Sequence, residues 1–222
     1  KKNFINLLFV LLPISFILGN SAINLNIGLI ALFFLVDLTK DRKIFYNENK
    51  IFFFIFFVFA IYLLISSLIS NYYDNENLLK AFLYIRFFLF ALAIKFYIDN
   101  DKINFNLIAK FWLIFLFIVI IDIFYEFIVG KNMLGYISPS SGRLVSFFKD
   151  ELIVGFFVST LGLISFSILI YKNRKYSLLF LLLIPIIFLT GERSSFIKIF
   201  FAISMISIII EKTFFDKKVF FF

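Results

Sequence analysis

Long apolar runs separated by short polar breaks dominate this chain. The runs cover residues 4–19, 22–36, 51–70, 78–98, 106–129, 152–171, 177–190 and 195–210. An α-helix needs about 20 apolar residues to cross the hydrocarbon core of a bilayer. Such runs must be helical, because hydrocarbon offers no partner to an unpaired backbone amide. The pattern predicts an all-α, polytopic transmembrane helical bundle of about eight helices, with residues 1–222 in a single membrane domain.

The basic residues fall in every second loop between the predicted helices. Lys40, Arg42 and Lys43 follow the second run, and Lys172 and Arg174 follow the sixth. Because lysine and arginine are enriched in cytoplasmic loops, this alternation predicts a cytoplasmic N-terminus. It places residues 71–77, 130–151 and 191–194 on the outer face, which is periplasmic in a Gram-negative inner membrane.

The amino-acid composition excludes several kinds of catalysis and binding site. The chain is 63% hydrophobic and 16% charged, and it contains neither cysteine nor histidine. These absences exclude thiol catalysis, disulfides and the usual zinc sites within these residues, and no Gly-rich phosphate loop indicates ATP hydrolysis. We therefore expect no cofactor and no metal. The net charge of +8 lies on loop lysines that set membrane orientation, so no nucleic-acid partner is expected.

Two charged breaks on the predicted outer face carry the candidate chemistry. In residues 142–151, Arg143 and Lys149 flank two phenylalanines, an arrangement that fits either an interfacial anchor or a pocket for a lipid-linked phosphate. In residues 191–195, Glu192 and Arg193 either neutralise each other or belong to an anion site at a helix N-terminus capped by serine.

Three charged residues lie inside predicted helices. Arg86 is about eight residues into the fourth run, where a cation is expected to face the bundle interior. Asp122 and Glu126 are four residues apart and share one helical face. Either a structural pair of Arg86 with Asp122 or a functional pocket explains them. Lys198, early in the last run, is expected to extend its amine to the outer surface.

The order of these motifs resembles the O-antigen ligase/polymerase family of bacterial inner membranes. The resemblance rests on residues 121–136, on RLVSFFKDE at 143–151 and on TGERSSF at 190–196. Ser146 stands where that family often has glycine. The chain starts at Lys1 and stops inside an apolar stretch, so we interpret it as the N-terminal portion of such a protein. The family's later periplasmic loop, with its histidine, is then expected outside these residues.

The resemblance implies a membrane glycosyltransferase, or ligase, of C type. Its donor is a glycan on undecaprenyl pyrophosphate, and its acceptor is lipid A–core in lipopolysaccharide biosynthesis. Polymerases of the family use another glycan as acceptor, and related O-oligosaccharyltransferases use a protein. The implied catalytic residues, which hold the donor pyrophosphate, are Arg143 and Arg193. The implied substrate-binding residues are Arg86, Lys149, Asp150, Glu151 and Glu192, with the last three expected to orient the arginines by ion pairing.

Two functions of other classes also fit an apolar helical bundle. A transporter or permease would show internal repeats and broken helices at corresponding positions. Pro13 and Pro185 do not fall at related positions. A non-catalytic membrane scaffold stays open as a third function, although arginines on the outer face make it less attractive.

Overall fold

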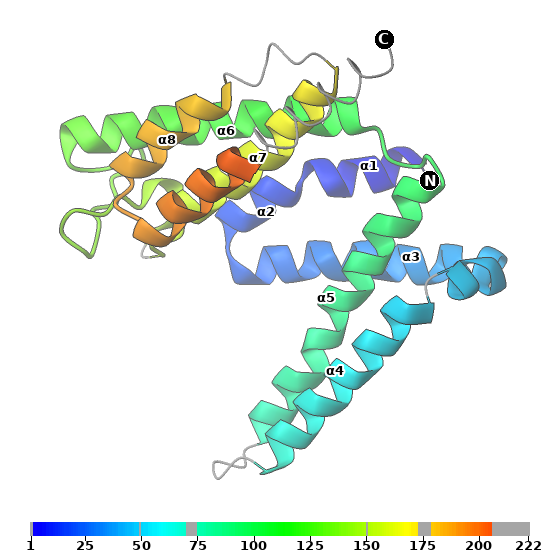
Figure 1. The fold of residues 1–222 in the computed structure, drawn as a ribbon. Helices are drawn as coiled ribbons and strands as arrows, with labels where there is room; N and C mark the ends of the chain where they lie inside the picture. Colours follow the sequence, from blue (N-terminus) through cyan, green and yellow to red (C-terminus); the bar gives the residue numbers. More distant parts are fainter. Residues whose placement is uncertain (1, 49, 70–74, 150, 173–178, 206–222) are drawn as a thin grey trace. The chain divides into compact units, whose positions relative to one another are not determined.

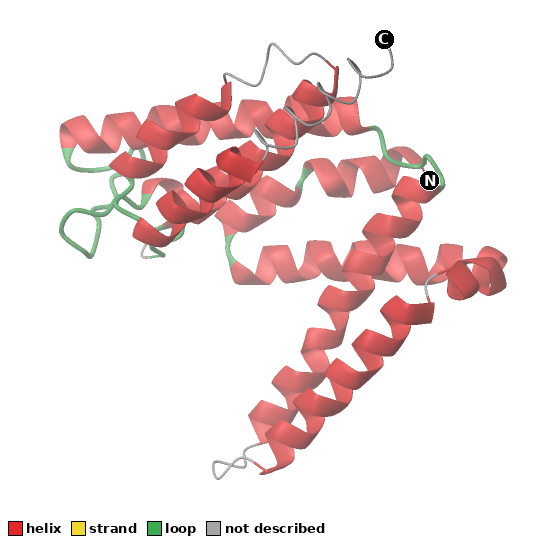
Figure 2. Ribbon diagram, in the orientation of Figure 1, coloured by secondary structure: helices red, strands yellow, loops and turns green. Residues whose placement is uncertain are grey.

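A computed structural model describes residues 2–48, 50–69, 75–149, 151–172 and 179–205. The described residues form helices and loops and contain no strand (Figure 2), which confirms the predicted all-α class. The chain divides into two compact units, residues 1–104 and residues 105–222. Each unit is described by itself below.

Unit 1 contains five of the helices labelled in Figure 1. They are α1 (Lys2–Val10), α2 (Leu12–Leu18), α3 (Asn20–Glu48), α4 (Lys50–Ile69) and α5 (Asn75–Asp99). In Figure 1, α5 crosses α3 and runs alongside α4. Aromatic side chains fill the α3–α5 crossing: the rings of Phe34 and Phe96 lie 5.5 Å apart, edge to face.

The first two predicted runs form a helical hairpin, and the structure differs from the predicted bounds in two ways. The first run is divided at Leu11, because Pro13 sits in the first turn of α2 and supplies no backbone N–H. Gly19 then reverses the chain with a φ of 104°, a conformation that glycine adopts at little cost. The second run extends into a helix that continues to Glu48 rather than ending near residue 36.

Polar side chains join α1 to the end of α5 in unit 1. The Asn6 amide donates to the Lys102 carbonyl at 3.2 Å, and its oxygen accepts from the Asn104 backbone at 2.7 Å. The Lys102 amine lies 3.9 Å from the Asp37 carboxylate and 4.6 Å from the centre of the Phe96 ring. These contacts fix one end of the unit and leave both ionic groups partnered.

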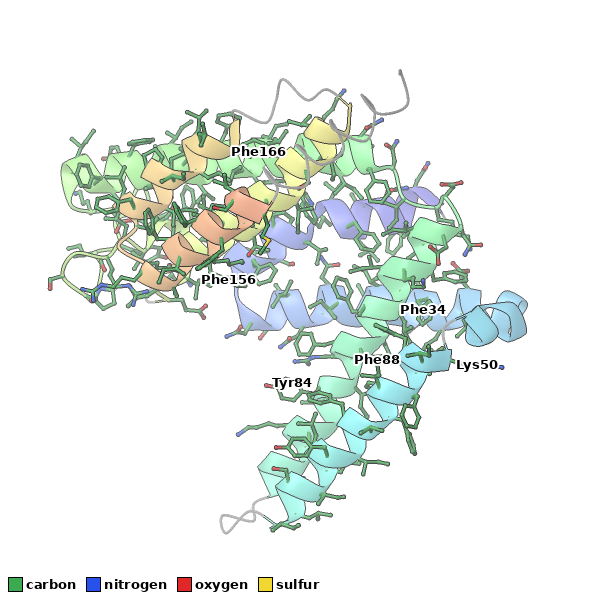
Figure 3. All side chains as sticks on the ribbon, in the orientation of Figure 1. Phe34, Lys50, Tyr84, Phe88, Phe156 and Phe166 are labelled. Atoms are coloured by element: carbon green, nitrogen blue, oxygen red, sulfur yellow. The ribbon has the colours of Figure 1, made fainter. Side chains whose placement is uncertain are left out.

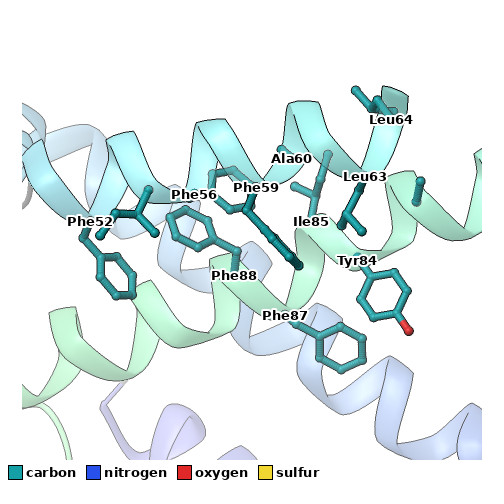
Figure 4. Close-up of a pocket in the computed structure, with 12 residues that line it drawn as sticks. Phe52, Phe56, Phe59, Ala60, Leu63, Leu64, Tyr84, Ile85, Phe87 and Phe88 are labelled. Atoms are coloured by element: carbon teal, nitrogen blue, oxygen red, sulfur yellow. The ribbon is translucent and has the colours of Figure 1, made fainter. Parts of the chain in front are cut away.

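An apolar groove of about 290 Å³ lies between α4 and α5 (Figure 4). Its lining is aliphatic and aromatic, and includes Phe52, Phe56, Phe59, Leu63, Tyr84, Ile85 and Phe88. The rings of Phe56 and Phe88 stack 3.4 Å apart across it. The lining contains no charged group, so the groove suits hydrocarbon and offers nothing to hold an anion.

Unit 2 contains α6 (Phe105–Val129), the short 3₁₀ helix η1 (Ser146–Phe148), α7 (Val154–Lys172) and α8 (Leu179–Leu189), followed by helical residues 193–205. α7 packs against both α6 and α8. Its Gly162 permits the close approach to α8, because an added Cβ there would lie 2.7 Å from Leu183 Cδ1.

Four helical segments are long and apolar enough to cross a membrane, among the residues that the structure describes. They are Asn20–Thr39, Lys50–Ile69, Leu79–Asp99 and Phe105–Val129, and Val154–Leu169 is a shorter apolar segment. α4 has no buried residue along its length. A helix that is apolar all round and lacks a covering core is typical of a membrane span.

Candidate functional site

The two charged breaks of unit 2 meet through their backbones. The Leu144 N–H donates to the Thr190 carbonyl at 3.2 Å. Gly191, with a φ of 72°, packs so closely that an added Cβ would overlap the Gly142 carbonyl oxygen and lie 3.3 Å from Arg143 Cα. Both breaks therefore lie at one end of unit 2, where α6 and α8 end and α7 begins (Figure 1).

Two buried carboxylates of α6 organise the first break. Asp122 accepts the Met133 N–H at 2.7 Å and the Ser146 hydroxyl at 2.6 Å. Glu126 accepts the Val145 N–H at 3.1 Å and the Ser146 N–H at 2.6 Å. A buried carboxylate is costly unless such donors surround it, so Asp122 and Glu126 anchor the loop to α6. Hydrogen bonds from this loop occupy both oxygens of Asp122, for which a structural pair with Arg86 was one of the two alternatives.

Ser146 has a backbone conformation that glycine adopts more readily than other residues. Its φ is 46°, in the left-handed region, and its side chain is fully buried. A residue with a Cβ is disfavoured there, but the hydrogen bonds to Asp122 and Glu126 hold Ser146 in place. The Asn132 amide also donates to the Ser146 carbonyl. The serine is therefore compatible with the conformation that glycine would adopt freely.

Glu192 of the second break caps α7 instead of pairing with a cation. Its carboxylate accepts the Gly155 N–H at 2.7 Å, the Phe156 N–H at 3.0 Å and the Ser195 hydroxyl at 2.8 Å. The first amides of a helix lack partners within the helix and attract negative charge. The expected ion pair between Glu192 and an arginine is thus replaced by bonds to the N-terminus of α7.

Arg143 lies in the loop before η1 and is half-buried. One guanidinium nitrogen, Nη2, donates to the Leu152 carbonyl at 3.0 Å, while Nε is buried without a hydrogen-bond partner. No carboxylate within the described ranges reaches ion-pair distance of this guanidinium. Arg143 is therefore a fixed cation with unused donors.

The other predicted residues of these breaks lie at the surface. Arg193 is exposed and begins the helix of residues 193–205, directly after the Glu192 cap. Lys149 is exposed and follows η1 with a φ of 55°. Glu151 is exposed, and its N–H donates to the Phe148 carbonyl at 3.0 Å. Asp150 lies outside the described residues.

Lys198 is a cation of this region whose position differs from the expectation. Its amine donates to the Thr160 hydroxyl at 2.7 Å and lies 4.4 Å from the centre of the Phe156 ring, both on α7. Phe156 is labelled in Figure 3. Lys198 therefore crosses to the neighbouring helix rather than extending along its own. The sequence carried no signal for this contact, because the burial of Ser195, three residues earlier and near the same helical face, is known only from the structure.

Arg86 belongs to α5 of unit 1. It is half-buried, its guanidinium lies 4.9 Å from the centre of the Phe87 ring, and its Nε is buried without a hydrogen-bond partner. It does not line the apolar groove between α4 and α5. Its environment is that of a cation held against an aromatic face.

The charges of unit 2 thus separate into two groups. Backbone amides and hydroxyls satisfy the carboxylates of Asp122, Glu126 and Glu192. The cations Arg143, Arg193 and Lys198 have no carboxylate partner among the described residues. Such an arrangement leaves positive charge available, which suits an anionic ligand with several oxygen acceptors. The described part of the chain contains no cluster of acidic side chains that would hold a metal.

Comparisons with models of protein families, with functionally characterised proteins and with solved structures found no match to this chain.

Proposed function

We propose that this chain belongs to an O-antigen ligase-like glycosyltransferase of a bacterial inner membrane. It transfers a glycan from undecaprenyl pyrophosphate to lipid A–core or another acceptor at the periplasmic face. The observation that carries the proposal is the backbone contact between Arg143 and Gly191, which joins the two arginine-bearing breaks at one end of unit 2. The motif order of the sequence supports the same assignment.

The arginines act on the leaving group. Transfer forms a bond between the acceptor oxygen and the anomeric carbon of the glycan, and breaks the bond between that carbon and the diphosphate. Negative charge therefore grows on the diphosphate oxygens. Guanidinium groups that are already in place stabilise this charge without reorganising, and they can contact two phosphate oxygens at once. Arg143, fixed by the Leu152 carbonyl, is preorganised for this role.

The acceptor proton must pass to a base during the same step. Asp122, Glu126 and Glu192 already accept hydrogen bonds from the backbone, and each supports a loop or a helix end. We therefore assign none of them as the base. A polymerase or a protein O-oligosaccharyltransferase would use the same donor site, and the acceptor consumed in the assay distinguishes the three.

Substitution of the arginines tests the proposed function. Glycan transfer by the full-length protein, measured with a lipid-linked donor, is expected to fall by about 10²-fold or more in Arg143→Ala and in Arg193→Ala, as for loss of one charge-stabilising donor. Lys131→Ala, an exposed loop lysine of the same unit, is the matched control and should retain transfer. Undiminished transfer in both arginine variants would remove the proposed role.

The proposal includes about eight transmembrane helices with a cytoplasmic N-terminus. Because the chain contains no cysteine, single cysteines report on this orientation without background. Ser141→Cys and Ser194→Cys should react with an impermeant maleimide from the periplasmic side, and Asn100→Cys only after the membrane is opened. The reverse pattern would place the arginines on the wrong side for a periplasmic donor.

A further inference from the structure

Lys198 is a cation that the sequence motifs do not include. It lies in unit 2 on the helix that starts at Arg193, and its amine reaches α7 at Phe156 and Thr160. An ammonium group carries three donors, and in the described structure one of them binds the Thr160 hydroxyl. Aromatic contact and one neutral hydroxyl are modest compensation for a charge held between apolar helices.

The position of Lys198 along α7 differs from that of Arg143. The Arg143 guanidinium binds the carbonyl of Leu152, two residues before α7 begins. Phe156 and Thr160 lie about 3 Å and 9 Å beyond the first residue of α7, since a helix rises about 1.5 Å per residue. Arg143 near the helix end and Lys198 farther along the helix therefore form a series of two cations at successive positions along α7.

This series matches the polarity of a lipid-linked diphosphate. In such a ligand one phosphate carries the prenyl tail, which lies in hydrocarbon, and the other carries the glycan, which lies in water. We propose that Lys198 contacts the phosphate that bears the prenyl tail, while Arg143 and Arg193 contact the phosphate that bears the glycan. This inference rests on the proposed function and deepens it by distinguishing the two phosphates of the donor.

The contact partners of Lys198 position its amine for this role. The Thr160 hydroxyl accepts a hydrogen bond from the amine at 2.7 Å and, being neutral, does not neutralise its charge. The Phe156 ring supports the ammonium group from one side, and Phe156 itself is tied by its N–H to Glu192. Glu192, which precedes Arg193 in the turn, therefore also fixes Phe156, whose ring contacts the Lys198 amine.

Binding of two prenyl phosphates to the purified full-length protein tests the proposal. The probes are farnesyl diphosphate and farnesyl monophosphate, with affinity measured by microscale thermophoresis in detergent. Lys198→Met keeps the apolar stem against Phe156 and removes the charge, so it should weaken both ligands by about tenfold, as expected for one hydrogen bond to a charged group. Lys198→Arg should restore most of the affinity. Lys131→Met, on the exposed loop, should bind as the wild type does.

The outcomes distinguish the role of Lys198 from the proposed function. Arg193→Ala should weaken the diphosphate more than the monophosphate, because the distal phosphate is its contact. Unchanged affinity of Lys198→Met for both ligands, while the arginine variants lose binding, would overturn the role of Lys198 and leave the proposed function standing. Unchanged affinity in the arginine variants as well would overturn both. Equal weakening of phosphatidylglycerol binding by Lys198→Met would show a general contact with anionic lipid and would also overturn the assignment.

Discussion

Removal of the Glu192 carboxylate is the perturbation whose cost the structure defines best. The carboxylate is buried and accepts three hydrogen bonds, two of them from the first amides of α7. Hydrogen bonds to a charged group contribute about 1.5–3 kcal/mol each to stability. Loss of the two amide bonds in Glu192→Ala is therefore expected to lower the free energy of unfolding by about 3–6 kcal/mol. The serine hydroxyl can rotate to a new partner and is left out of this sum.

Glu192→Gln separates hydrogen bonding from charge. Its amide oxygen can accept one of the two α7 amides, while its NH₂ group faces the other donor. The expected loss is about half that of the alanine variant, roughly 1.5–3 kcal/mol. Reversible unfolding of the purified protein by titration from mild detergent into SDS, followed by helical circular dichroism, gives both free energies.

Lys131→Gln serves as the control for Glu192. Lys131 is exposed in the same unit, and surface substitutions of this kind change stability by about 0.5 kcal/mol or less. If Glu192→Ala were as stable as the wild type, or more stable than Glu192→Gln, the carboxylate would not stabilise the N-terminus of α7. The turn that carries Arg193 would then not be preorganised.

Two glycine positions and one serine give further stability predictions under the same assay. Gly191→Ala should cost about 2–5 kcal/mol, because the left-handed φ and the overlap with the Gly142 backbone add. Gly130→Ala, with a φ of 80° but open space around it, should cost only about 1 kcal/mol; equal losses would refute the close contact between the two breaks. Ser146→Gly should be about 1 kcal/mol more stable than Ser146→Ala, since both lose the Asp122 hydrogen bond and only glycine relieves the φ of 46°. The reverse order would contradict the strained conformation.

Apolar length predicted the hydrophobic helices well. The runs 51–70 and 106–129 correspond to α4 (Lys50–Ile69) and α6 (Phe105–Val129) within one residue at each end. These boundaries are sharp because a polar break ends each run. The end of α3 was not predicted, because residues 37–48 are mostly polar and continue the helix without an apolar signal.

The sequence predicted the residue types of the site but not the hydrogen bonds that they form. The spacing of Asp122 and Glu126 correctly placed both carboxylates on one face of α6. Their partners lie 11 to 24 residues away, however, in the loop after α6 and at the first residue of η1. Glu192 was expected to pair with a neighbouring arginine, but its partners are amides that lie 36 and 37 residues away. Periodicity within one element carries no information about such pairings.

The convergence of the two breaks depends on glycine as much as on charge. Gly142 and Gly191 both have positive φ, and their backbones approach closely beside Arg143. A sequence shows that these residues are glycines, but it does not show which backbone each one approaches. The sequence alone therefore does not predict that Arg143 lies beside the turn that carries Arg193.

Affinity for a prenyl diphosphate tests the central claim most directly. The claim is that Arg143 and Arg193 bind the same diphosphate at one end of unit 2. Farnesyl diphosphate should bind the wild-type protein more tightly than farnesyl monophosphate, and Arg143→Ala and Arg193→Ala should each reduce that preference by about tenfold or more, as expected for loss of one charge-assisted contact. A preference that survives unchanged in the double variant would contradict the account.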